Sequence, residues 1–112
     1  MNQFSSAPEI SIIIPTYNRA EMIKDTINSI LNQNDCTSEI IVIDDCSTDN
    51  TGEIIKSIDN QNIYYYKLQS NSGSQVARNF GSEKANADLL LFLDSDDILL
   101  PGSLRFRIDY FQ

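Results

Sequence analysis

Four short apolar runs, each followed by a segment with helical spacing, most strongly limit what this chain of 112 residues can fold into. We expect strands at about 10–15, 39–44, 63–68 and 88–93. Between them, apolar residues recur every three or four positions, as they do in amphipathic helices. Strands that alternate with helices form a mostly parallel sheet with right-handed crossovers. We therefore predict an α/β fold in three layers, with the sheet between helices.

The fourth run, Leu89 to Leu93, leads directly into the carboxylates of Asp94, Asp96 and Asp97. Because this run has no polar alternation, we expect a strand that is buried on both faces. Three acids this close repel one another unless a cation lies between them, and Mg²⁺ and Mn²⁺ prefer oxygen ligands. The pattern therefore predicts a divalent-metal site just past the strand. The alternative is that the acids form only a polar loop before the next helix.

Two other strand ends carry residues that are suited to a ligand. The first expected strand ends in Pro15, Thr16 and Tyr17, and the second ends in Asp44 and Asp45. All carboxyl ends of a parallel sheet lie on one rim, and open α/β sheets bind their ligands there. Acids that served only for solubility would be scattered over the helix surfaces. The convergence of three such ends predicts a binding site at this rim.

The charge of the chain limits the classes of partner. Its net charge is −8, from 16 acidic and 8 basic residues, and it has no histidine. This argues against a nucleic-acid partner, because phosphate backbones need a basic face. A phosphate ligand remains compatible if a metal ion supplies positive charge. Any general base would have to be a carboxylate.

The ends of the chain and its two cysteines bear on the cellular compartment in which the protein is expected. Residues 1–8 are expected to be a flexible leader without a signal-peptide pattern, and no apolar stretch is long enough to span a bilayer. Cys36 and Cys46 fit no metal-binding spacing and are expected to be free thiols. We expect a cytoplasmic location, with peripheral attachment to the inner face of the membrane as a further option.

Four motifs, in this order and spacing, resemble the nucleotide-sugar-binding half of family 2 glycosyltransferases. They are Ile12–Asn18 (IIIPTYN), Val42–Asp49 (VIDDCSTD), Asn71–Gly73 with Ala77–Asn79, and Leu93–Asp97 (LDSDD). The resemblance extends from about residue 10 to residue 104, and it implies that residues 9–112 are the donor-binding part of such a domain. It also implies the A-type glycosyltransferase fold, a Rossmann-like fold whose first four strands are ordered 3-2-1-4.

The resemblance further implies roles for single residues. Tyr17 would pack against the base and ribose, Asp45 would accept a hydrogen bond from a uracil-type N–H, and Arg78 would face the base pocket and the acidic motif. Asp97 would more often be structural. The residues expected to contact the nucleotide are Pro15, Thr16, Tyr17, Asp45, Arg78, Asp94 and Ser95. Those expected to hold Mg²⁺ or Mn²⁺ are Asp96 and Asp94.

Some of these residues also have a purely structural interpretation. Tyr17 could cover the start of the first helix, and Arg78 could form an ion pair with Asp45 or Asp94. Asp44 is expected to be structural, as a cap of the second helix. These alternatives stay open at the level of sequence, because each uses the same chemical groups as the ligand-binding role.

Three further residues carry expectations about the local backbone. Asn18 is expected to cap the first helix, over about 20–33, with Glu21 as its reciprocal partner. Gly81 lies in the middle of the third helix, where glycine costs about 1 kcal/mol relative to alanine. Its presence there predicts close packing against a neighbouring element. Cys46 occupies a turn position at which the family most often has glycine.

The resemblance places the acceptor site and the catalytic base in a half of the domain that these residues do not match. Asp109 is the one acid after Asp97. We therefore expect the donor-binding region of a metal-dependent, inverting glycosyltransferase that uses a UDP-sugar and, in the full enzyme, a saccharide or lipid-linked acceptor. We expect this chain to be inactive alone. The alternative is a non-catalytic nucleotide- or metal-binding module of the same fold.

A signalling receiver domain ranks far lower, because the first strand ends in Pro15-Thr16-Tyr17 and not in an acidic pair.

The family domain has further strands that these residues do not match. They would flank the fourth strand, so Leu89–Leu93 is expected to lie at an open edge. Exposed apolar edge strands pair readily with another chain. We therefore expect self-association into a homo-oligomer, by edge pairing or by a hydrophobic face.

Overall fold

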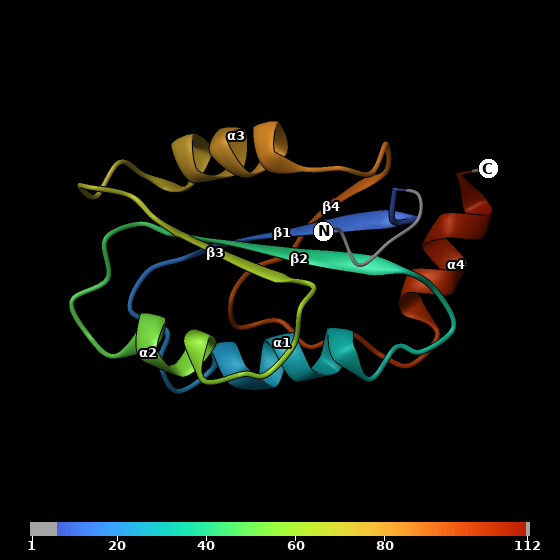
Figure 1. Cartoon of the computed structure of the whole chain (residues 1–112), viewed down its shortest axis with the longest axis horizontal. Helices are drawn as coiled ribbons and strands as arrows, with labels where there is room; N and C mark the ends of the chain where they lie inside the picture. Colours follow the sequence, from blue (N-terminus) through green and yellow to red (C-terminus); the bar gives the residue numbers. More distant parts are fainter. Residues whose placement is uncertain (1–6, 112) are drawn as a thin grey trace.

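The computed structural model describes residues 7–111 and shows one sheet between two layers of helices (Figure 1). The four strands are parallel and lie in the order β3-β2-β1-β4. This confirms the predicted three-layer α/β fold and its strand order. The leader predicted at residues 1–8 falls mostly outside the described residues. The strands are β1 (Ile10–Thr16), β2 (Ser38–Asp44), β3 (Ile63–Lys67) and β4 (Leu90–Phe92).

Helix α3 (Ser74–Lys84) covers one face of the sheet, and α1 (Ile23–Leu31), α2 (Thr51–Lys56) and α4 (Ser103–Tyr110) pack on the other. Side chains of the strands alternate between the two faces. Ile12 and Ile14 therefore belong to the cluster around α1, whereas Ile13 packs against α3. None of these helices has the length and apolar character needed to cross a membrane.

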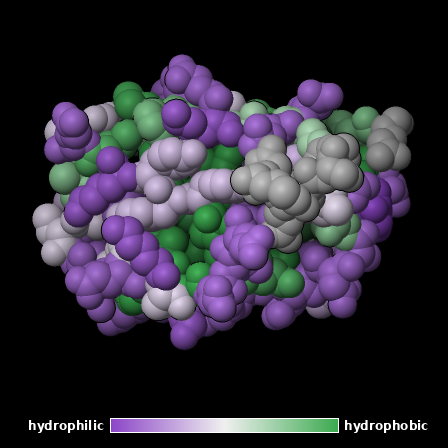
Figure 2. Space-filling view, in the orientation of Figure 1, coloured by the Kyte–Doolittle hydropathy of each residue, from purple (hydrophilic) through white to green (hydrophobic). Residues whose placement is uncertain are grey.

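The three tyrosines of β3 show the same alternation. Tyr65 packs on the side of α1 and α2, whereas Tyr64 and Tyr66 pack on the side of α3. The ring of Tyr66 meets that of Phe80 edge to face, with centroids 5.6 Å apart. On the face of the molecule seen in Figure 2, hydrophilic residues predominate, and hydrophobic ones are visible in the middle and toward the left end.

Gly81 lets α3 approach the sheet closely. A Cβ atom at this position would lie 2.5 Å from Cγ2 of Ile13 and 3.3 Å from Cγ1 of Ile43. Both isoleucines are fully buried, and β-branched side chains have little freedom to rotate away. The structure confirms the close packing that a glycine in mid-helix predicts.

Strand β4 departs from one expectation and confirms another. It is three residues long, and among residues 7–111 it pairs with β1 alone, so it lies at the edge of the sheet. Phe92 is 46% exposed, and Leu90 and Leu91 are only half-buried. Burial on both faces, as predicted from the apolar run, is therefore wrong, because an edge strand has no second neighbour. The open edge itself is confirmed, and association through it stays a prediction.

The start of α1 also differs from the prediction. The helix begins at Ile23, and no side chain caps it. Asn18 has a φ of 52°, and its Oδ1 accepts hydrogen bonds from the backbone N–H groups of Thr48 (2.8 Å) and Asp49 (3.3 Å). Asn18 therefore joins the loop after β1 to the loop after β2. A contact between loops that are 30 residues apart replaced the predicted local cap.

Candidate functional site

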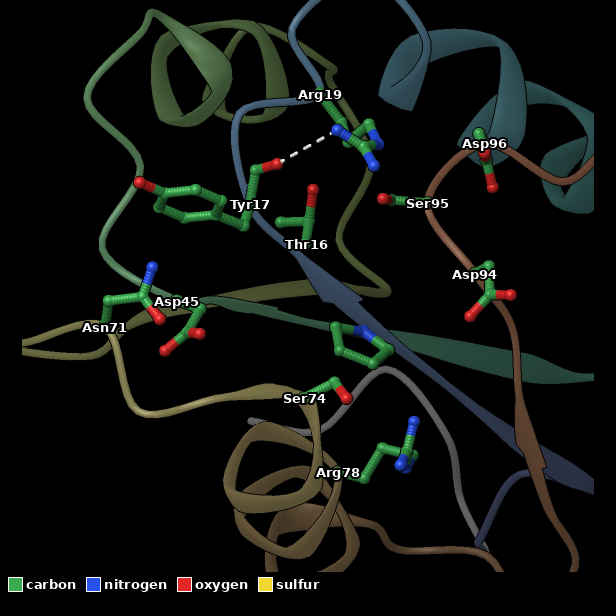
Figure 3. Close-up of a pocket in the computed structure, with 11 residues that line it drawn as sticks. Thr16, Tyr17, Arg19, Asp45, Asn71, Ser74, Arg78, Asp94, Ser95 and Asp96 are labelled. Carbon is green, nitrogen blue, oxygen red and sulfur yellow. Dashed lines mark hydrogen bonds between the residues drawn. The ribbon is translucent and has the colours of Figure 1, made fainter.

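A cavity of about 360 Å³ opens at the carboxyl ends of β1, β2 and β4 (Figure 3). Its walls come from these three strand ends and from the start of α3 with the loop before it. Every residue that the sequence predicts as a nucleotide or metal ligand lies here, together with three that it does not predict. The lining residues are Pro15, Thr16, Tyr17, Arg19, Asp45, Asn71, Ser74, Arg78, Asp94, Ser95 and Asp96.

Asp45 connects the end of β2 to the loop before α3. Its side chain is buried, and its two oxygens accept hydrogen bonds from the backbone N–H groups of Ser72 (2.7 Å) and Gly73 (2.9 Å). Gly73 has a φ of 94°, which glycine adopts at low cost. Asp45 thus holds the loop that brings Asn71 and Ser74 to the cavity. Each carboxylate oxygen has further acceptor capacity, so contact with a ligand remains open to it.

Tyr17 presents an aromatic surface to the same end of the cavity. Its ring lies near Asp45 and Asn71 (Figure 3), and the residue is 41% exposed. Within residues 7–111 it belongs to neither of the two apolar core clusters. A partly exposed ring at a cavity wall is suited to stacking on a planar ligand.

Thr16 combines burial with an unsatisfied polar atom. It is 3% exposed, and its Oγ1 has no hydrogen-bond partner among residues 7–111. Its carbonyl oxygen accepts a hydrogen bond from the backbone N–H of Asp45 at 2.8 Å. Buried hydroxyl groups nearly always have a partner. The free Oγ1 at the cavity wall is therefore suited to a polar group of a ligand or to a bound water.

Arg78 enters the cavity from α3, and among residues 7–111 it has no carboxylate partner. Its guanidinium donates a hydrogen bond to Oε1 of Gln75 at 3.3 Å. In the described part of the chain it forms no ion pair with Asp45 or Asp94, so the structural interpretation of Arg78 is wrong. An unpaired guanidinium that faces a cavity is suited to an anionic ligand.

The acidic segment after β4 has the donor set of a hard metal ion. Asp94, Asp96 and Asp97 are exposed, and each offers a carboxylate oxygen such that all three atoms lie within 4.8 Å of one another. Within residues 7–111, no lysine or arginine forms an ion pair with these carboxylates. Three oxygen donors without a cationic partner fit Mg²⁺ or Mn²⁺. Asp97, which the resemblance implies to be structural, belongs to this cluster.

Asp44, unlike Asp45, faces the interior. It is fully buried, and its oxygens accept hydrogen bonds from the backbone N–H of Ser47 (2.8 Å) and the hydroxyl of Tyr65 (2.5 Å). Burial, together with the Asp44 carboxylate, raises the pKa of the Tyr65 phenol well above its usual range. Asp44 is structural, as predicted, but it does not cap α2: the N-cap position is Asn50, without a side-chain capping bond.

The turn between these acids and α2 contains a non-glycine residue in a left-handed conformation. Cys46 has a φ of 67°, a region that only glycine occupies without a steric penalty. This explains why the position is expected to be glycine in similar chains. Its thiol donates a weak hydrogen bond to the carbonyl oxygen of Gln69 over 3.7 Å. The backbone is therefore left-handed at this position although the residue carries a side chain.

Arg19, Asn71 and Ser74 line the cavity although the sequence did not predict them as site residues. Arg19 donates a hydrogen bond to the carbonyl oxygen of Tyr17 over 3.4 Å, which is the dashed line in Figure 3. It donates another to the carbonyl oxygen of Asn18 over 3.4 Å. The sequence offers one indication of their role, which is that each residue lies within or next to one of the four motifs. Position alone does not say which way a side chain points, and that is why these three were missed.

Comparison with known proteins covers nearly the whole chain. Residues 11–112 match the family model described as Glycosyl transferase family 2. This chain belongs to glycosyltransferase family 2. The family 2 domain is 42% identical over 105 residues to TuaG of Bacillus subtilis, whose name is "Putative teichuronic acid biosynthesis glycosyltransferase TuaG". The match covers 92% of this chain and 42% of TuaG.

A second relative is GalNAc(5)-diNAcBac-PP-undecaprenol beta-1,3-glucosyltransferase of Campylobacter jejuni. It is 38% identical over 100 residues, which are 87% of this chain and 32% of that protein. The family 2 domain described here therefore spans less than half the length of both relatives.

Solved structures share the fold. Staphylococcus aureus TarS 1–349 in complex with UDP superposes with a TM-score of 0.84 and 34% identity, over 91% of this chain and 31% of that chain. Mannosyltransferase PcManGT from Pyrobaculum calidifontis, in complex with GDP-Man and Mn²⁺, superposes with a TM-score of 0.75 over 84% of this chain and 29% of that chain. At 23% identity, the second likeness concerns the fold alone. The A-type glycosyltransferase fold implied by the sequence is confirmed.

Proposed function

We propose that this family 2 domain binds a nucleotide-diphospho-sugar, specifically a UDP-sugar, through Mg²⁺ or Mn²⁺ as the donor site for inverting glycosyl transfer. One observation carries the proposal: a single cavity joins an aromatic end to an acidic end (Figure 3). Tyr17 and Asp45 lie at the first end, and Asp94 and Asp96 lie at the second. A nucleoside diphosphate has the same division, with a planar base at one end and charged phosphates at the other.

At the aromatic end, Tyr17 would stack on the base and Asp45 would accept a hydrogen bond from the N–H of uracil. The unsatisfied Oγ1 of Thr16 would supply a further polar contact. The UDP complex of TarS, which is 34% identical to this domain, supports uridine as the nucleoside. Guanine and adenine are larger, and their polar edges differ from that of uracil.

At the acidic end, Asp94 and Asp96 would hold the metal, with Asp97 close enough to contribute. A bound divalent ion supplies positive charge that offsets the charge of the diphosphate as the glycosidic bond breaks. Arg78 would add a second positive charge on the opposite wall. The phosphate oxygens of the ligand would complete the coordination, so two or three carboxylates suffice.

Binding and transfer should separate in these 112 residues. The acceptor hydroxyl needs a base, and the acid that follows the metal segment, Asp109, is paired with Arg105 at 2.8 Å on α4. We propose that the base and the site for a saccharide or lipid-linked acceptor come from a part of longer family domains that these residues do not match. A non-catalytic nucleotide-binding module is the second candidate, and the paired state of Asp109 favours it for this chain alone.

Calorimetry tests the proposal directly. Titration of the 112-residue chain with UDP should show binding when Mn²⁺ is present and little binding in EDTA, while GDP should bind more weakly than UDP. Release of UDP from a panel of UDP-sugars should stay at background. If a sample that is folded by circular dichroism fails to bind UDP with Mn²⁺ or Mg²⁺, the proposed donor site is wrong. Robust transfer to an acceptor would show that the base lies within this chain.

Replacement of Asp45 by asparagine should weaken UDP binding by about 10-fold or more. An amide presents one donor in place of an acceptor, so it loses a hydrogen bond to the loop N–H groups and opposes the N–H of uracil. Loss of a hydrogen bond to a charged group costs roughly 1.5–3 kcal/mol. The measurement is calorimetry of Asp45→Asn with UDP and Mn²⁺.

The matched control is Asp59→Asn, which makes the same charge change at an exposed residue outside the cavity. The ratio of UDP to GDP affinity separates two effects. A direct contact with the base changes this ratio, whereas a disturbed loop lowers both affinities together. Unchanged UDP affinity in folded Asp45→Asn would contradict a role in binding.

A further inference from the structure

One face of α1 carries three buried polar residues where an amphipathic helix normally has apolar ones. Thr26, Ser29 and Gln33 lie at spacings of three and four along the chain, at the helix and just past its end. Their exposed fractions are 0%, 9% and 7%. Buried polar groups are costly unless they have hydrogen-bond partners. The partners of these three residues show what the polar face does.

Thr26 and Ser29 bind the segment that carries the acids. The hydroxyl of Thr26 donates a hydrogen bond to the carbonyl oxygen of Ser95 over 2.9 Å. The hydroxyl of Ser29 accepts one from the backbone N–H of Leu99 over 3.0 Å and donates to the carbonyl oxygen of Thr26 over 2.7 Å. The contacts with Ser95 and Leu99 join residues about 70 positions apart in the chain.

Gln33 continues this series toward α4. Its Nε2 donates to the carbonyl oxygen of Leu100 over 2.7 Å, and its Oε1 accepts from the backbone N–H of Leu104 over 3.3 Å. In Figure 1 the segment that follows β4 runs along α1 on its way to α4. Two hydrogen bonds from α1 and two from Gln33, just past its end, thus hold the backbone of residues 95–104 at four points.

This segment needs such support because of its charge. The carboxylates of Asp94, Asp96 and Asp97 have oxygens within 4.8 Å of one another, and like charges at this distance repel. Ser95 lies between the first two acids, so its carbonyl orientation limits the backbone directions of both. A segment held only by its own turn would be free to move its acids apart before a cation arrives.

We propose that Thr26, Ser29 and Gln33 are positioning residues, through which α1 holds the acidic segment in the arrangement that binds the metal. The inference rests on the proposed function, since it takes Asp94 and Asp96 to be metal ligands. Thr26 has the most direct effect, because its partner lies between those two acids. Groups that orient metal ligands commonly change metal affinity by about 10–100-fold when they are removed.

The test replaces Thr26 with valine, which has a similar shape but no hydroxyl. This change leaves the Ser95 carbonyl without its donor. Binding of Mn²⁺ is measured by electron paramagnetic resonance in the presence of UDP, as the loss of the free-ion signal when protein is added. The loss that UDP causes without protein is subtracted. We expect Thr26→Val to bind Mn²⁺ about 10-fold more weakly than the native chain. Thr26→Ser, which keeps the hydroxyl, should restore most of the affinity.

Ser11→Ala is the matched control. Ser11 is also fully buried, and its hydroxyl donates to Glu39 over 2.6 Å, but it does not line the cavity. This variant should lose stability without losing Mn²⁺ affinity. If Thr26→Val does not fold, Thr26→Ser and Thr26→Ala provide the comparison, because they differ only in the hydroxyl.

The outcomes separate the inference from the function on which it rests. A folded native chain that fails to bind Mn²⁺ would overturn the proposed metal site itself. If the native chain binds Mn²⁺ and Thr26→Val binds it equally well, the inference about α1 is overturned while the metal site stands. Weaker binding by Thr26→Val with recovery in Thr26→Ser supports the inference when Ser11→Ala keeps its Mn²⁺ affinity, because loss of a buried hydroxyl elsewhere then lowers stability without affecting the metal.

Discussion

Asp96→Ala should abolish the metal-dependent part of UDP binding. Asp96 lines the cavity and belongs to the three-carboxylate cluster. The variant would hold the metal less tightly, because it has one carboxylate ligand fewer. The negative charges of the diphosphate and of the remaining acids would then repel one another. Calorimetry should show the same weak UDP affinity with Mn²⁺ as in EDTA. Because Asp96 is exposed, the free energy of unfolding should change little.

The matched control for this variant is Asp88→Ala. Asp88 is also exposed and precedes β4, but it does not line the cavity. It makes the same change in net charge, so it reports any effect of charge alone. If UDP affinity still rises with Mn²⁺ in Asp96→Ala, then Asp96 is not the metal ligand and the acidic cluster acts in another way.

Gly81→Ala should lower the free energy of unfolding by about 1–3 kcal/mol, the usual cost of adding a methylene to a packed core. The sign is informative, because helix propensity alone would stabilise alanine by about 1 kcal/mol. The new methyl would lie 2.5 Å from Cγ2 of Ile13, so α3 or the strand must shift. Urea denaturation followed by circular dichroism measures the difference.

Glu83→Ala serves as the comparison for Gly81→Ala. Glu83 is exposed on the same helix, and surface substitutions usually change stability by less than about 0.5 kcal/mol. A variant Gly81→Ala that is as stable as the native chain, or more stable, would show that α3 can move away from β1 at no cost. Because α3 also carries Arg78, such movement would bear on the cavity.

Much of the fold could be predicted from the sequence, because the determining patterns are local. The β-branched runs at Ile10–Ile14 and Glu39–Ile43 indicate buried strands wherever they lie in the sheet. The position of the candidate site followed from the same reasoning. Acids and aromatic residues directly after strands must meet at the carboxyl rim, since parallel strands all end on one side.

Strand burial could not be predicted in the same way. The run Leu89–Leu93 is as apolar as a central strand, yet β4 lies at the edge and Phe92 is 46% exposed. The capping prediction for Asn18 failed for a related reason, because a neighbouring loop offered better partners for its side chain. In both cases the deciding neighbour is distant in the sequence.

The alternation of strands and helices, and the rim at which the acids gather, follow from apolar spacing and strand direction, which are properties of short segments. The hydrogen bonds of the site instead depend on how distant segments pack. Asp45 holds a loop 27 residues away, and Thr26 holds a carbonyl 69 residues away. A polar side chain in a sequence shows what it can donate or accept. Its partner is set by which backbone groups the packed fold leaves unsatisfied beside it.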